Sequence, residues 1–158
     1  MKKIFFLVAF IATAFGQYSF AQNNTNNTSS QLLTQYYAIK DALVSSNAST
    51  AAAKASEFVK TANSIDDKTL PEASRTALLK DAGDIVKTKD IKKQREYFAG
   101  FSDHMFALAK TTELSTEPIY KAYCPMKKAS WLSSSTAIKN PYFGGSMLTC
   151  GKVVETLK

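Results

Sequence analysis

Tyr-Cys-Pro-Met at residues 123–126 and Met-Leu-Thr-Cys-Gly at residues 147–151 delimit the stretch around which we expect the fold to be organised. This stretch contains both cysteines of the 158-residue chain, its only tryptophan and two of its four methionines. Turn-forming pairs lie between the two ends, at Asn140-Pro141 and Gly144-Gly145. We therefore predict a loop-rich cap, supported by the part of the chain that precedes it.

Short strands are expected on both sides of this cap. Residues 119–123 alternate in polarity and are rich in aromatic side chains, and residues 152–157 have a composition that also suits a strand. Antiparallel pairing of these two strands would bring Cys124 and Cys150 close together. The sequence therefore predicts a small two-stranded cap whose two cysteines are adjacent.

Four helices are predicted upstream, because apolar residues recur there at intervals of three and four. Two starting signals are clear: Thr69 stands three residues before Glu72, the spacing of a capping box, and Asp90 precedes the last helix. The expected helices cover residues 31–45, 50–63, 71–87 and 91–112. Their short connections favour an up-down four-helix bundle, so the fold class is predicted to be mainly α.

The first 21 residues have the features of a secretory signal peptide. Two lysines precede an apolar run from Ile4 to Phe15, and small residues favour cleavage after Ala21. Residues 22–30 contain only Asn, Thr, Ser and Gln, which predicts a disordered linker. We expect a single domain over residues 31–158, in a periplasmic or secreted protein that meets the membrane only through its leader before cleavage.

Charge and motif content argue against several classes of function. The formal net charge of +7 falls to +5 without Lys2 and Lys3 of the predicted leader, and the other lysines are spread along the predicted helices, which favours a solvated surface over nucleic-acid binding. The sequence contains no Ser-His-Asp pattern, carboxylate pair or dinucleotide fingerprint, so we do not expect an enzyme. His104 is interpreted as a packing residue and Trp131 as an anchor of the cap, and both are also candidate accessory residues of a site.

Four sulfur side chains would come together under the predicted strand pairing: Cys124, Met126, Met147 and Cys150. Thiolate and thioether ligands select soft cations such as Cu(I). Zinc is less favoured, because the chain has neither a Cys-x-x-Cys motif nor a pair of histidines. In an exported protein the same cysteines could instead form a disulfide, with the methionines in the core. Both interpretations stay open at this point.

The same segments resemble a bacterial domain of unknown function. The likeness rests on Tyr-Cys-Pro-Met, Trp-Leu-Ser at 131–133, Asn-Pro-Tyr-Phe-Gly at 140–144 and Met-Leu-x-Cys-Gly. That domain occurs in small secreted proteins and at the C-terminus of heavy-metal efflux adaptor proteins of the copper/silver type. The resemblance implies a metal-related context, with the four sulfur residues as the candidate binding positions and envelope efflux components as candidate partners.

These observations lead to one expectation and one alternative. We expect an exported, non-enzymatic protein that binds Cu(I) or a similar soft ion, as a carrier or as an accessory to an efflux system. The alternative is a disulfide-stapled interaction module that binds a partner protein and no metal.

Overall fold

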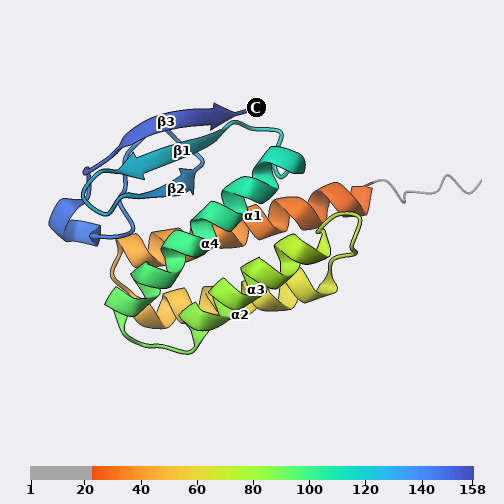
Figure 1. Cartoon of the computed structure of the whole chain (residues 1–158), viewed down its shortest axis with the longest axis horizontal. Helices are drawn as coiled ribbons and strands as arrows, with labels where there is room; N and C mark the ends of the chain where they lie inside the picture. The colour runs from red at the N-terminus through yellow and green to blue at the C-terminus, as the bar shows by residue number, and fades with distance from the viewer. Residues whose placement is uncertain (1–22) are drawn as a thin grey trace, which may run out of the picture.

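The computed structural model describes residues 23–158, which form four helices followed by a small antiparallel sheet (Figure 1). The helices are α1 (Asn23–Val44), α2 (Ala48–Ser64), α3 (Glu72–Val86) and α4 (Ile91–Thr111). The strands are β1 (Ile119–Cys124), β2 (Ala129–Ser133) and β3 (Lys152–Leu157), and the short 3-10 helix η1 (Gly144–Met147) precedes β3. The mainly α class is confirmed, while the predicted signal peptide over residues 1–21 lies outside the described residues.

Side-chain caps explain where two of the helices begin. The Asn47 side chain accepts a hydrogen bond from the Thr50 amide at 2.9 Å, and α2 begins at the next residue after Asn47. Asp90 accepts from the Lys92 amide at 2.8 Å at the start of α4, as the sequence predicted. Each bond satisfies an amide that has no partner inside the first turn of its helix.

The predicted capping box at Thr69 is wrong. Helix α3 begins directly after Pro71, without a hydrogen bond from any capping side chain. Asp66 instead accepts hydrogen bonds from the amides of Lys68 and Thr69, at 3.0 and 2.9 Å. The loop before α3 is therefore closed by an aspartate turn, which uses the amide of the residue that was expected to act as the cap.

Helix α1 includes residues 23–30, for which the sequence predicts a linker. At the end of this polar run, Ser29 is buried and donates to the Glu113 carbonyl at 3.4 Å, beyond the end of α4. Nowhere in residues 23–158 is there a helix with both the length and the hydropathy required to cross a membrane.

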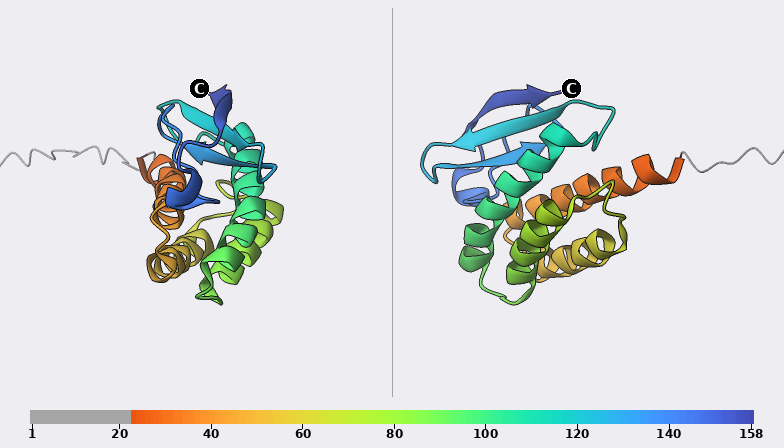
Figure 2. Two further views of the ribbon diagram at one scale, coloured as in Figure 1. Left: turned by 90° about the vertical axis from the view of Figure 1, so that its left-hand side faces the viewer. Right: turned by 45° about the vertical axis from the view of Figure 1, so that its right-hand side comes forward.

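The helices pack against one another in sequence order, α1 on α2, α2 on α3 and α3 on α4. Helix α4 also packs on β2, and it meets α1 through side chains, with the Tyr36 ring against Phe98 and Phe101. Figures 1 and 2 show the sheet on the side of α1 and α4 that faces away from α2 and α3. The predicted up-down bundle is therefore not confirmed, because the sheet is a layer of the fold in its own right.

The sheet has three strands in the order β2-β1-β3, and both pairings are antiparallel, so the predicted two-stranded cap is wrong. Strand β2 follows β1 through a turn over residues 125–128, in which Lys128 has a positive φ of 55°. The Lys128 amide donates to the Cys124 carbonyl at 2.8 Å and closes this turn. Strand β3 then pairs with the other side of β1, with Tyr123 opposite Lys152.

Tyr36 connects the helices to the sheet. Its side chain is fully buried, and its ring stacks on Phe98 of α4 with 5.3 Å between centroids. Its hydroxyl lies 2.7 Å from Ser102 Oγ and accepts a hydrogen bond from the Leu132 amide of β2 at 3.0 Å. One side chain of α1 thus contacts both α4 and the edge of the sheet.

We expect the Tyr36→Phe variant to lose about 2 kcal/mol of unfolding free energy, because the buried Leu132 amide would be left without its acceptor. Urea denaturation followed by circular dichroism measures the loss. Tyr37→Phe is the matched control, since the Tyr37 ring is only partly buried and no hydrogen bond of its hydroxyl is found among the described residues. Equal stabilities of the two variants would contradict the role given to the Tyr36 hydroxyl.

Candidate functional site

The two cysteines lie next to each other at one end of the sheet. Cys124 is the last residue of β1, and Cys150 lies two residues before β3. Their Sγ atoms are 3.6 Å apart, and both thiols are free. Cys124 is fully buried, whereas Cys150 is partly exposed. The structure thus brings together the two residues on which both interpretations of the sequence depend.

Gly151 allows the chain to pass close to the sheet beside this pair. Its φ is +147°, a conformation that other residues rarely adopt. A Cβ atom at this position would lie 2.7 Å from Cη2 of Trp131 and 3.0 Å from the Tyr123 carbonyl oxygen. Only glycine therefore fits between Cys150 and the start of β3 without a shift of the neighbouring atoms.

Asn140, at the start of the loop over residues 140–150, binds Cys150 at the end of this loop. Its side chain is fully buried, and Nδ2 donates to the Cys150 carbonyl at 2.6 Å. Its Oδ1 accepts from the Tyr142 amide at 2.8 Å. The sequence predicts Asn140 only as a turn residue, because Asn-Pro is a common turn dipeptide and gives no sign of a bond to Cys150.

The electrostatic environments of the two thiols differ. Burial raises the pKa of Cys124, but hydrogen bonds from the Lys127 amide, the Asn140 side chain, Cys150 and the Met126 amide together bring it below its ordinary value. The hydrogen bond to Cys124 and, next, burial raise the pKa of Cys150. Cys124 is therefore the thiol that ionises first, with Cys150 as its hydrogen-bond donor.

The side chains of Met126 and Met147 are exposed to solvent. Met126 lies in the turn after β1 and is 65% exposed, and Met147 ends η1 and is 41% exposed. The main chain ties Met147 to the site, since its carbonyl accepts from the Cys150 amide at 3.1 Å. The interpretation of both methionines as core residues is wrong at these exposures.

The structure places the two candidate accessory residues differently. His104 of α4 is bonded through Nδ1 to Asp81 Oδ2 of α3 at 2.6 Å. Trp131 is buried in β2, lies edge-on to Tyr142 at 6.1 Å between ring centroids, and has its ring against Gly151. Trp131 therefore packs beneath the cysteine end of the sheet, while His104 is held by a carboxylate between two helices.

No three histidine, cysteine, aspartate or glutamate side chains within residues 23–158 lie close enough together to hold a metal ion. The predicted pair Cys124 and Cys150 is brought together, with 3.6 Å between the two Sγ atoms. Any further ligand from the described chain would have to be a residue of another type, such as methionine.

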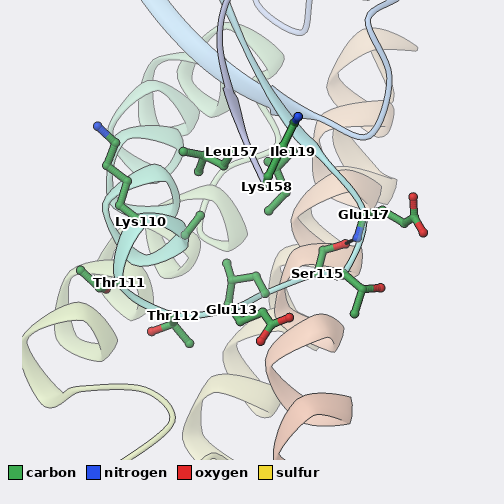
Figure 3. Close-up of a pocket in the computed structure, with 12 residues that line it drawn as sticks. Lys110, Thr111, Thr112, Glu113, Ser115, Glu117, Ile119, Leu157 and Lys158 are labelled. Atoms are coloured by element: carbon green, nitrogen blue, oxygen red, sulfur yellow. Dashed lines mark hydrogen bonds between the residues drawn. The ribbon is translucent and has the colours of Figure 1, made fainter.

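Two hollows in the surface differ in the residues that line them. One of about 310 Å³ is lined by Tyr123, Pro125, Gly151 and Lys152, the neighbours of the two cysteines. A second, of about 380 Å³, lies between the end of α4 and the ends of β1 and β3 (Figure 3). Figure 3 shows the side chains of Lys110 and Glu117 pointing away from each other on opposite sides of this hollow. We therefore place the candidate site at the cysteine pair.

Comparison with known proteins gives one match. A family model described as a protein of unknown function (DUF3347) matches residues 32–117. This range covers most of α1 and all of α2, α3 and α4, and it ends before β1, so the cysteine pair lies outside it. No curated protein and no solved structure matches the chain.

Proposed function

We propose that this chain, which belongs to the DUF3347 family, binds Cu(I) or a similar soft ion through Cys124 and Cys150. The observation that carries the proposal is the 3.6 Å separation of their sulfur atoms. Two sulfurs that each lie ~2.3 Å from a shared ion are at most ~4.6 Å apart, so a separation of this size lies within reach of one ion. The pair requires no large rearrangement to act as a ligand set.

The ionisation of Cys124 also supports the binding of a soft cation by the pair. Cys124 receives several hydrogen bonds that favour its thiolate form, and thiolate is the form that binds metal. Met126 and Met147 are exposed and lie two and three residues from Cys124 and Cys150 in the sequence, and their flexible side chains offer neutral thioether ligands at any pH. In this proposal the two thiolates bind the ion and the methionines complete its coordination.

The biological setting that we propose is the cell envelope. The support is the signal-peptide pattern of residues 1–21 and the resemblance of the cysteine segments to domains of copper/silver efflux adaptors. The protein would act there without catalysis, as a metal carrier or as an accessory to efflux components.

A disulfide-stapled interaction module is the second candidate, and the same observation favours it. Closure from 3.6 Å to a sulfur–sulfur bond of ~2.05 Å needs only a small movement. In the chain-entropy model, a bridge over this loop would stabilise the fold by about 3.5 kcal/mol. In this case the exposed Met126 and Met147 would contact a partner protein rather than an ion.

Titration of the reduced protein with Cu(I), in competition with a chromogenic chelator, tests the metal proposal. We expect the Cys124→Ser/Cys150→Ser variant to bind more weakly by more than ~100-fold, beyond the loss typical of residues that only support a ligand. Met126→Leu/Met147→Leu should cause a smaller loss. The matched control is Met105→Leu, which changes a buried methionine of α4. Equal affinities of the wild type and the double serine variant would reject metal binding at this site.

The mass of the protein, isolated under non-reducing conditions with free thiols alkylated, separates the two candidates. Two alkyl groups per chain would mean that the thiols are free and available to a metal. A chain without alkyl groups, lighter by two hydrogen atoms than the reduced form, would mean that the disulfide is the resident state.

A further inference from the structure

We propose that Asn140 is the positioning residue that holds Cys150 against Cys124 and thereby determines how readily the two sulfurs act as a pair. The part of this inference that concerns metal affinity rests on the proposed function. The part that concerns the joint reactivity of the two thiols does not.

The ladder of the sheet does not by itself fix Cys150. Pairing between β1 and β3 ends with Tyr123 opposite Lys152, two residues after Cys150. The Cys150 amide is bonded only locally, to the Met147 carbonyl at 3.1 Å. Contacts from another part of the chain must therefore hold this cysteine beside the end of β1.

The Asn140 side chain supplies such a contact. Its Nδ2 donates to the Cys150 carbonyl at 2.6 Å across ten residues of sequence. Its Oδ1 accepts from the amides of Tyr142 and Phe143, at 2.8 and 3.3 Å, so the amide group is anchored at its other end. The side chain is 0% exposed, which leaves water no access to replace these bonds.

The Asn140 main chain closes the same loop. Its amide donates to the Leu148 carbonyl at 2.8 Å, and its carbonyl accepts from the Gly144 amide at 3.0 Å. Main-chain and side-chain bonds of one residue therefore join the beginning of the 140–150 loop to its end. Since a carboxylate accepts but does not donate, Asn140→Asp would keep the bonds of Oδ1 and remove both the bond to the Cys150 carbonyl and the hydrogen bond that the Asn140 side chain gives to Cys124.

This geometry makes Asn140→Asp an informative variant. When the bond to Cys150 is lost, the sulfurs should spend less time at a separation suited to a shared ion or a bridge, which lowers their effective concentration. We expect the Cu(I) affinity to fall by about 10- to 100-fold, the range seen when residues that orient metal ligands are changed.

The second measurement does not involve metal. The protein is equilibrated with reduced and oxidised dithiothreitol, so that the two thiols lose two protons and two electrons as a disulfide forms. Oxidised dithiothreitol gains them and becomes the dithiol. We expect the equilibrium constant for closing the Cys124–Cys150 bridge to fall about tenfold in Asn140→Asp, in line with a lower effective concentration of the pair.

Asn63→Asp is the matched control. Asn63 is an exposed residue of α2 whose Nδ2 donates to the Val59 carbonyl at 2.9 Å. The control therefore introduces the same charge and removes one amide-to-carbonyl hydrogen bond at a position outside the sheet. If Asn140→Asp does not fold, Asn140→Ser, which is smaller and uncharged, replaces it with the same expectations.

The outcomes separate the two proposals. A bridge-closing constant equal to that of the control, in a variant that is merely less stable to urea, would overturn the positioning role. If the wild type does not bind Cu(I) but the bridge-closing constant falls as expected, the proposed function fails and the role of Asn140 stands.

Discussion

Replacing Gly151 with alanine is expected to lower the free energy of unfolding by about 3 kcal/mol, through steric overlap and an unfavourable backbone conformation. The added Cβ would lie 2.7 Å from the Trp131 ring and 3.0 Å from the Tyr123 carbonyl oxygen, closer than unstrained contacts allow. The main chain there would have to move away from β1, and Cys150 would move with it. We therefore expect weaker pairing of the thiols as well as lower stability.

Gly145→Ala is the control for this variant. Gly145 has no atom within 4 Å of the position of an added Cβ, and its φ is not positive. Urea denaturation of the two variants gives the comparison, together with the equilibrium of the cysteine pair with dithiothreitol. If both variants had the stability of the wild type, the close approach at Gly151 would not matter for the fold.

Trp131→Ala is expected to cost about 4 kcal/mol, the range observed when a large buried aromatic side chain is removed. Trp131 is 1% exposed in β2, lies edge-on to Tyr142 and contacts the Gly151 position from below. Its removal would leave a cavity next to Tyr142 and Gly151. Thermal unfolding followed by circular dichroism measures the loss.

The control for this second variant is Tyr97→Ala on α4, where the side chain is 40% exposed. We expect it to cost less than about 1 kcal/mol, because surface substitutions remove few buried contacts. A Trp131→Ala variant with a cost as small as this would contradict the view that the indole ring supports the cysteine end of the sheet.

Local sequence patterns predicted the four helices because apolar residues repeat within them at helical spacing, although the start of α1 and the capping box of α3 were not predicted correctly. Asp90 caps α4, and Phe98, Phe101 and Met105 repeat at the spacing of one buried face. The strand β2 was missed because its position depends on the preceding turn. Lys128 adopts a positive φ there, and lysine is not a residue type that predicts this conformation.

The site was predictable only in part for a similar reason. The pairing of β1 with β3 followed from composition, and it places Cys124 near Cys150. The bond from Asn140 to Cys150 connects positions that no helical or strand periodicity relates. The same holds for the bond between Tyr36 and the Leu132 amide, which are 96 residues apart. Such contacts appear only when the chain is folded.

The long separation of Tyr36 from Leu132 has a consequence for the order of events during translation. As the polypeptide leaves the ribosome, its helices emerge first and can begin to pack through contacts between neighbouring elements. The sheet cannot dock until β2 has emerged, and Cys124 cannot meet its companion until 26 further residues have been synthesised. During that interval the nascent chain carries a Cys124 thiol without its partner, and this thiol can attack a disulfide of another molecule, forming a mixed disulfide and releasing the other sulfur as a thiolate.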